Sequence, residues 1–275
     1  MFSIRNKDTM SIANMRIMIA PVGFEVDRVV VPAIQNRVDK VFLIMHNNKS
    51  GDKAASFFKR IVDELKKNNI KSEEVQADRN NLFELIKIVR KIIDDSRKSE
   101  FLINVSSGSK IQAVACMMAI MIFDDRTNLK PFYVEPEKYN EEYKKKNIQQ
   151  SYGIKNIYEL PTYQIKTPDY KLLKALEIIK EYTNKPNYKG RINKKELARI
   201  LEEREVIKIG GITEPGESVP KNHKNSKYST LDKQIVQPLK STDSKGWGFI
   251  TEEKIGRSRY ISFTEEGRNA SEFLF

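Results

Sequence analysis

Short apolar runs alternate with amphipathic segments over the first half of the chain. Residues 15–22, 40–45, 101–105 and 131–134 are almost continuously hydrophobic, as in strands that are covered on both faces of a sheet. Between them, apolar residues recur at three- and four-residue spacing in 52–68, 82–93 and 111–123, which predicts helices. A weaker strand at 74–77 and a first helix at 27–37, bent or interrupted at Pro32, complete the alternation, which ends near Pro136. The pattern predicts an α/β, doubly wound, Rossmann-like domain with a parallel sheet.

The second half of the chain has a different pattern. After a polar, Lys-rich stretch at 139–150 and an edge strand or hairpin expected at 154–165, amphipathic helices are predicted at 170–182 and 229–240. A further helix follows Asn193, where Glu196 three residues later completes a capping-box pattern. Two strand-like stretches, 247–251 and 260–263, flank a turn at Gly256. Three helices and a two-stranded wing predict an α+β winged helix-turn-helix domain.

These patterns divide the 275 residues into two domains, which suits the length of the chain. We expect an N-terminal extension at 1–14, a Rossmann-like domain at 15–167 and a winged-helix domain at 168–275. Two features depart from a simple winged helix. Pro238 falls inside the predicted third helix, and the connection at 204–228 is longer than usual, so its role stays open.

The charge of the chain favours a polyanionic partner. The chain has a formal net charge of +12, and cationic side chains that neutralise phosphates release the counterions condensed on a nucleic acid, so double-stranded DNA is the leading candidate. The longest apolar run, 113–123, is too short to span a bilayer, and residues 1–14 lack a signal-peptide stretch. We therefore expect a cytoplasmic protein with no membrane partner. One cysteine and two distant histidines give no metal-ligand spacing, so neither a metal site nor a cofactor is expected.

Ligands of doubly wound sheets bind beyond the carboxyl ends of the strands. There, a loop of small residues that enters a helix, such as residues 106–110, can offer backbone N–H groups to a phosphate. The alternative is structural: Gly108 permits a tight turn and Ser109 caps the helix. Neither G-x-x-x-x-G-K-[ST] nor G-x-G-x-x-G after the first strand is present, which disfavours ordinary ATP or NAD enzymes. The predicted ligand-binding residues are Val22, Gly23, Phe24, His46, Asn47, Ser106, Ser107, Gly108, Ser109 and Lys110.

Two of these loops carry a family resemblance. The run PVGFEVDRVVVPAIQNRVDKVFLI, followed later by INVSSGSKIQAVA, resembles the CARF (CRISPR-associated Rossmann fold) domain of archaeal CARF and winged-helix regulators, over about residues 15–163. The family's first loop matches residues 22–24 and its second matches residues 106–110, although many relatives carry paired glycines at Ser107-Gly108. The resemblance implies a homodimer whose shared pocket binds a cyclic oligonucleotide second messenger, a cyclic oligoadenylate that is most often the tetra-adenylate.

The third helix of the winged-helix domain is the predicted recognition helix. In such domains this helix reads the major groove and the wing contacts the backbone or the minor groove. The alternative is that these charges form a solvated face and that the domain serves dimerisation or protein contact. The predicted DNA contacts are Lys227, Ser229, Thr230, Lys233, Gln234, Gln237, Arg257 and Arg259.

Together these features predict a ligand-responsive transcription regulator with no catalytic residues, which by resemblance would control CRISPR or related defence genes. One alternative is a ring nuclease that cleaves the cyclic oligoadenylate, in which Ser107 and Lys110 would assist. The other is a regulator that senses a different small molecule.

Overall fold

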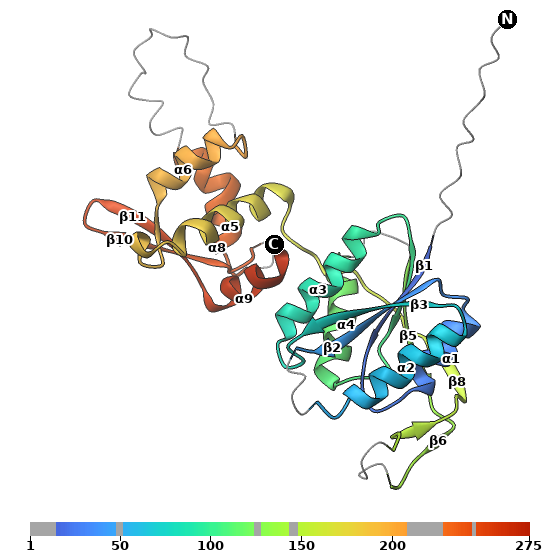
Figure 1. Ribbon diagram of the computed structural model, residues 1–275. Coiled ribbons are helices and arrows are strands. Elements are labelled where there is room, and N and C mark those ends of the chain that lie inside the picture. The colour runs from blue at the N-terminus through green and yellow to red at the C-terminus, as the bar shows by residue number, and fades with distance from the viewer. Residues whose placement is uncertain (1–14, 48–51, 124–127, 143–147, 208–227, 244–245) are drawn as a thin grey trace, which may run out of the picture. The chain divides into compact units, whose positions relative to one another are not determined.

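The computed structural model describes residues 15–47, 52–123, 128–142, 148–207, 228–243 and 246–275 (Figure 1). The chain forms two compact units, one up to Ile165 and a second from Lys166 onward. The predicted boundary after Thr167 lies close to this division. Each unit has its own hydrophobic core, so each is described by itself.

The N-terminal unit contains a six-stranded sheet. Its strands are β1 (Arg16–Pro21), β2 (Lys40–His46), β3 (Lys71–Ala77), β4 (Glu100–Asn104), β5 (Leu129–Glu135) and β8 (Asn156–Glu159). The spatial order is β3-β2-β1-β4-β5-β8. The first five strands run parallel, and β8 pairs antiparallel with β5 at the edge. The predicted edge strand is therefore present, and the strand order reverses between β1 and β4.

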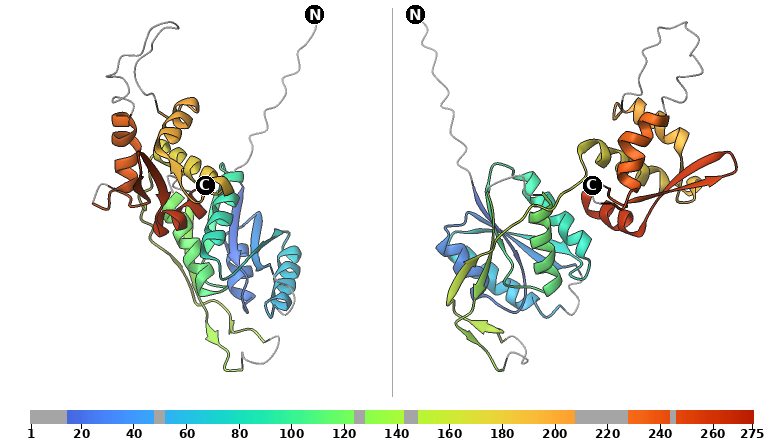
Figure 2. Two further views of the ribbon diagram at one scale, coloured as in Figure 1. Left: turned by 90° about the vertical axis from the view of Figure 1, so that its left-hand side faces the viewer. Right: turned by 180° about the vertical axis from the view of Figure 1, so that it is seen from behind.

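Helices cover both faces of this sheet, as the apolar strands require. Helices α1 (Asp27–Gln35) and α2 (Ala55–Lys67) lie on one face, and α3 (Leu82–Asp95) and α4 (Lys110–Phe123) lie on the other (Figure 1). Figure 2 shows the two helix layers and the sheet between them from two other directions. Strand residues such as Met18, Leu43 and Ile103 are completely buried. The predicted Rossmann-like α/β fold is confirmed.

Of the two possibilities at Pro32, a bend or an interruption, the interruption is wrong, because α1 is one continuous helix. Proline lacks an N–H, so the carbonyl four residues earlier, that of Arg28, loses its helical partner. The side-chain amide of Asn104 donates to this carbonyl instead, at 2.7 Å. A buried side chain at the end of β4 thus completes the hydrogen bonding of α1, and the helix continues to Gln35.

A short hairpin after β5 forms a separate two-stranded sheet. Strand β6 (Lys138–Tyr139) pairs with β7 (Ser151–Tyr152). The residues around β7 are bonded to the segment that joins β1 to α1. The Gln150 N–H donates to the Phe24 carbonyl at 2.9 Å, and the Val26 N–H donates to Gln149 Oε1 at 2.6 Å.

The C-terminal unit is a winged helix, as predicted. Its elements are α5 (Tyr170–Thr183), η1 (Pro186–Tyr188), β9 (Ile192–Asn193), α6 (Lys194–Glu203), η2 (Asp232–Val236), α8 (Gln237–Lys240), β10 (Ile250–Ile255), β11 (Ser258–Phe263) and α9 (Glu265–Leu274). Strands β10, β11 and β9 form one antiparallel sheet in that order. The stripes predicted for the three helices, including Leu176, Leu197 and Ile235, are buried in its core.

The wing is longer than predicted and its turn is tighter. Strands β10 and β11 pair from Ile250–Phe263 to Ile255–Ser258, so only Gly256 and Arg257 remain in the turn. Gly256 has φ +59°, which suits the first central position of a tight hairpin turn. Arg257 therefore lies at the tip of the wing, whereas Arg259 lies within β11 rather than in the loop.

Pro238 is accommodated by a change of helical pitch. The preceding turn, η2, is π-helical, and the Gln237 N–H donates to the Asp232 carbonyl five residues earlier. A wider turn before the proline relieves its steric clash with the preceding turn. The predicted recognition helix thus continues through Pro238 to Lys240.

Helix α9 was missed because its sequence contains Gly267, which weakens a helical pattern. The glycine is needed for packing, because a Cβ there would lie 1.9 Å from the Phe249 carbonyl oxygen.

Within the described residues, no helix is both long and apolar enough to cross a membrane.

Candidate functional site

The loops that follow β1 and β4 meet where the strand order reverses. The Gly23 N–H donates to Ser107 Oγ at 3.1 Å, and a Cβ on Gly23 would lie 2.7 Å from the Gly108 nitrogen. Gly108 has φ +84°, and a Cβ there would lie 2.5 Å from the Cβ of Pro21. Only glycine permits this approach. The two sequence-predicted loops, 22–24 and 106–110, therefore form one continuous surface at the reversal point, which is where ligands of such sheets bind.

The two serines of the second loop hold it in place. The Val134 N–H donates to Ser106 Oγ at 2.6 Å, which ties this loop to β5. Ser106 is 9% exposed and Ser107 is 3% exposed, whereas Gly108 and Lys110 are exposed and Ser109 is half-buried. The surface that the second loop offers to a ligand is therefore that of residues 108–110.

Ser109 caps helix α4 through a reciprocal pair of bonds. The Ser109 N–H donates to Gln112 Oε1 at 2.8 Å, and the Gln112 N–H donates to Ser109 Oγ at 3.2 Å. This capping box uses two of the donors at the helix N-terminus. Among the described residues, the N–H groups of Lys110 and Ile111 have no hydrogen-bond partner. The capping role and the anion-binding role are thus compatible, because the cap leaves two donors and the helix dipole available.

A buried ion pair supports the first loop and was not among our predicted residues. Arg28 Nη1 lies 2.8 Å from Glu25 Oε1, and both side chains are 6% exposed. Arg28 Nε donates to the Val134 carbonyl at 2.9 Å, and Ser151 Oγ donates to Glu25 at 2.8 Å. The available signal in the sequence was a pair of opposite charges three residues apart at the start of a predicted helix. The pair joins the first loop to β5 and to the β6–β7 hairpin.

The carboxyl ends of β2 and β3 lie at the same end of the sheet as the two loops, on the far side of β1 from β4. His46 is half-buried, with Nδ1 at 3.4 Å from both the Ala77 oxygen and the Arg79 nitrogen. Asn47 is exposed, and its N–H donates to the Ala77 carbonyl at 3.0 Å. Asp52, which our predictions omitted, pairs with Arg79 Nη2 at 2.5 Å.

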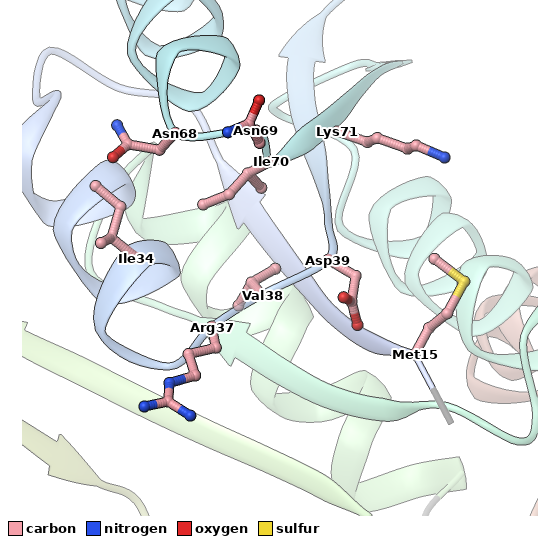
Figure 3. Close-up of a pocket in the computed structure, with 9 residues that line it drawn as sticks. All are labelled: Met15, Ile34, Arg37, Val38, Asp39, Asn68, Asn69, Ile70 and Lys71. Atoms are coloured by element: carbon pink, nitrogen blue, oxygen red, sulfur yellow. The ribbon is translucent and has the colours of Figure 1, made fainter. Parts of the chain in front are cut away.

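A cavity of about 560 Å³ lies at the opposite end of the sheet, where the parallel strands begin (Figure 3). It is lined by Met15, Ile34 and residues 37–39 and 68–71, which lie at or before the starts of β1, β2 and β3. None of the predicted ligand-binding residues lines it. It lies away from the carboxyl ends of the strands, where such folds bind their ligands.

The predicted DNA contacts that the structure describes lie on the surface of the winged helix. Ser229, Lys233, Gln234 and Gln237 are exposed, Thr230 is half-buried, and Arg257 and Arg259 are exposed on the wing. A groove of about 760 Å³ along the recognition helix is lined in part by Ser229, Lys233 and Gln237. Lys227 lies outside the described residues.

A cluster of charges joins the wing to the helices. The Glu252 side chain on β10 is 5% exposed and accepts from Lys194 Nζ at 2.8 Å, Arg259 Nη1 at 3.2 Å and Lys240 Nζ at 3.4 Å. Lys194 also pairs with Asp232. Burial would raise the pKa of Glu252, but the ion pairs, led by Lys194, outweigh it and lower that pKa. Arg259 is therefore partly neutralised within the protein, whereas no such partner is recorded for Arg257 in the described residues.

Cys116 lies on the buried side of α4. Burial raises the pKa of its thiol to about 12, so the group stays protonated near neutral pH. It packs as a small apolar side chain.

Two family models match the chain in succession. Residues 16–139 match the model described as "HFX_2341_N:-like, N-terminal". Residues 171–274 match the model described as "DUF6293 C-terminal winged helix domain". The predicted order of a Rossmann-like domain followed by a winged helix is thereby confirmed.

The chain is also similar to individual proteins. The uncharacterized protein MJ1513 of Methanocaldococcus jannaschii is 29% identical over 185 residues, which are 59% of this chain and 55% of that protein. Csm6 of Enterococcus italicus, solved with cyclic hexa-2′-fluoro-hexa-dAMP, aligns at a TM-score of 0.38 with 13% identity, over 70% of this chain and 50% of that one. Can2 of Sulfobacillus thermosulfidooxidans, solved with cyclic tetra-adenylate, aligns at a TM-score of 0.37 with 14% identity, over 70% and 46%. The chain thus spans about half the length of each protein.

Gly23→Ala tests the close approach of the two loops. Gly23 does not have a positive φ, so alanine brings no backbone strain, and the whole cost comes from the contact with Gly108. We expect the N-terminal unit to lose about 1–3 kcal/mol of unfolding free energy, measured by urea denaturation. A gain in stability, as at a glycine with free space, would contradict the close approach.

The lowered pKa of Glu252 gives the C-terminal unit a pH dependence. A carboxyl whose pKa falls on folding adds stability above its ordinary pKa near 4.5, and this stability is lost as the pH falls through the folded value. We expect urea stability, followed by the fluorescence of the single Trp247, to drop below about pH 4.5. Glu252→Gln should lower stability at neutral pH by roughly 3 kcal/mol and flatten the acid slope. An unchanged slope in the variant would assign the effect to other carboxyls.

Proposed function

Because the chain joins an HFX_2341_N-like domain to a DUF6293 winged-helix domain, we propose that it is a ligand-controlled DNA-binding regulator. Its N-terminal unit binds a cyclic oligoadenylate, and binding changes the affinity of the C-terminal unit for a DNA operator. The observation that carries the proposal is the meeting of the loops 22–24 and 106–110 at the reversal point of the sheet, beside the N-terminus of α4.

The chemistry of the paired loops supports an anionic ligand. The Lys110 and Ile111 N–H groups, the positive end of the α4 dipole and the exposed Lys110 side chain all favour a phosphodiester. The described residues of the two loops carry no acidic side chain that would oppose it. The choice of a cyclic oligoadenylate, the tetra-adenylate first, follows from the resemblance of both loops to the CARF family.

The outer face of α4 supports a homodimer. This helix is apolar almost all round, which is typical of a helix that is covered on every side. Yet Ile111, directly after Lys110, is 38% exposed, and Val114, one turn beyond Lys110, is 50% exposed. A second copy packed on this face would cover both residues and bring two sets of loops together around one ligand.

The winged helix supplies the DNA contacts. Lys233, Gln234 and Gln237 on the recognition helix and Arg257 at the tip of the wing are the side chains we propose to touch the duplex. Regulation then requires that the ligand bind one arrangement of the dimer more tightly than the other. The genes controlled, by resemblance, are CRISPR or related defence genes, and the protein needs no cofactor or catalytic residue for this role.

Calorimetry of the full chain with cyclic tetra-adenylate tests the sensor role directly. We expect binding, and about 10- to 100-fold weaker binding by Lys110→Ala, since a charge-assisted hydrogen bond to phosphate contributes about 1.5–3 kcal/mol. A gel shift on the protein's own promoter should change when the ring is added. Linear products in the same incubation would instead identify a ring nuclease, and the absence of binding would favour a different ligand.

Lys233→Ala and Arg257→Ala test the DNA interface. Each lost phosphate contact should lower the slope of log affinity against log salt by about 0.9. Fluorescence anisotropy with the promoter duplex at several salt concentrations measures this slope. Lys171→Ala, an exposed lysine on α5, is the control and should leave it unchanged. Equal slopes in all three variants would rule out the proposed interface.

Val114→Glu tests the dimer face. A charge on the exposed face of α4 should not disturb folding, but it would be costly inside a dimer contact. We expect light scattering to give a dimer for the unsubstituted chain and a monomer for the variant. Gln35→Glu, which adds the same charge to the exposed part of α1, should remain dimeric. A variant that still dimerises would place the contact on another face.

A further inference from the structure

One buried carboxylate oxygen at the ligand edge has no hydrogen-bond partner among the described residues. The Asp52 side chain, just before α2, is 2% exposed. Its Oδ1 accepts from Arg79 Nη2 at 2.5 Å and from the Ala54 N–H at 3.1 Å. Its Oδ2 is buried and has no hydrogen-bond partner in the described part of the chain. Buried polar atoms are almost always hydrogen-bonded, and a charged oxygen needs this most, so Oδ2 calls for a donor that the described residues do not supply.

The position of Asp52 connects it to the paired loops. Arg79 follows β3, and its N–H lies 3.4 Å from the Nδ1 of His46 at the end of β2. Phe57, in the second turn after Asp52, packs against Phe24 of the first loop with 5.6 Å between ring centroids. Neighbouring strands are about 4.8 Å apart, so the β2–β3 side lies roughly 10–15 Å from the loop that follows β4. This distance is within the reach of a base whose phosphate sits on the paired loops.

The side chains around Oδ2 select the kind of partner. A metal cation is disfavoured, because Arg79 already brings its positive charge to the same carboxylate. Arg79 is 29% exposed and carries five N–H donors in one plane, of which Nη2 contacts Asp52. The pair therefore presents an acceptor beside donors. The edge of adenine offers the complement, an amino donor beside the acceptor N7.

We propose that Asp52 and Arg79 form a base-reading subsite, in which Asp52 Oδ2 accepts from the exocyclic amino group of a purine and Arg79 donates to a neighbouring ring nitrogen. The proposal rests on the function proposed above, because it takes the phosphates of the same ligand to lie on the paired loops. It adds a reason for the ligand to carry amino-substituted bases. A hypoxanthine base, which has a carbonyl oxygen in place of the amine, would set that oxygen against the carboxylate.

The test compares two rings on the full chain by calorimetry: cyclic tetra-adenylate and cyclic tetra-inosinate. We expect the unsubstituted protein to prefer the adenylate by about 10- to 100-fold, as for a hydrogen bond to a charged group. In Asp52→Asn, the amide oxygen can keep the bonds from Arg79 and Ala54, which leaves an NH₂ donor at the place of Oδ2. The preference should then reverse toward the inosinate. A purely structural role of Asp52 would weaken both rings equally.

Matched variants complete the experiment. Asp63→Asn, on the exposed side of the same helix α2, should keep the adenylate preference. Arg79→Lys keeps the charge but loses the planar donors, so it should reduce the adenylate preference without reversing it. If Asp52→Asn does not fold, this variant still tests the subsite. The 2′-deoxy form of the adenylate ring should bind as tightly as the ribo form.

The outcomes separate the two proposals. If both rings bind the unsubstituted protein equally, or if Asp52→Asn keeps the full adenylate preference, the base-reading subsite is wrong while the sensor role stands. If only the 2′-deoxy ring loses affinity, the partner of Oδ2 is a ribose hydroxyl and the base assignment is overturned. If neither ring binds, the proposed effector and the subsite both fail.

Discussion

The close approach of two backbones, at Gly23 and Gly108, is the constraint on which the ligand edge depends. A parallel sheet whose strand order reverses leaves a gap between two loops, here those that follow β1 and β4. The Gly23 N–H spans this gap to Ser107 Oγ, and neither glycine has room for a Cβ. The gap is thereby reduced to a single surface formed by peptide groups. Such a surface can come close to a phosphate, because no side chain intervenes.

Buried polar side chains beneath the loops hold this surface in place. Asn104 bonds to the carbonyl that Pro32 leaves without a partner, and the Glu25–Arg28 pair ties the start of α1 to β5 and the hairpin. Removing one member of a buried pair costs about 3–5 kcal/mol, far more than a surface pair would. Apart from Arg28 Nη2, for which the described residues supply no acceptor, the polar atoms of these side chains hold the loops in place, and the N–H groups at the start of α4 remain for a ligand. In the C-terminal unit, Glu252 has a similar part, because it holds the wing and the recognition helix through Lys194 and Lys240.

Much of this arrangement was predictable from the sequence, for physical reasons. Strands covered on both faces must be apolar throughout, so hydrophobic runs identified the strands, and periodic spacing identified the helices between them. Because ligands of such sheets bind beyond the carboxyl ends of the strands, the loops at those ends could then be selected as the candidate site. The burial of Ser106 and Ser107 was not predictable, because a serine that bonds to a distant β5 has the same local sequence as one that faces a ligand. Asp52 and Arg79 pair across 27 positions of chain between two loops, a contact with no local pattern. Helix α9 and the π-helical turn before Pro238 depend on tertiary packing and backbone adjustment, which hydrophobic periodicity does not report.

The central claim is that loops 22–24 and 106–110 form one binding surface for an anionic effector. Hydrogen–deuterium exchange of the full chain, with and without cyclic tetra-adenylate, tests it directly, because exchange reports the protection of backbone amides segment by segment. The account predicts that peptides covering residues 22–24 and 107–111 gain protection together at the same ligand concentration. Protection confined to residues 37–39 and 68–71, around the cavity at the opposite end of the sheet, or protection of only one of the two loops, would contradict it.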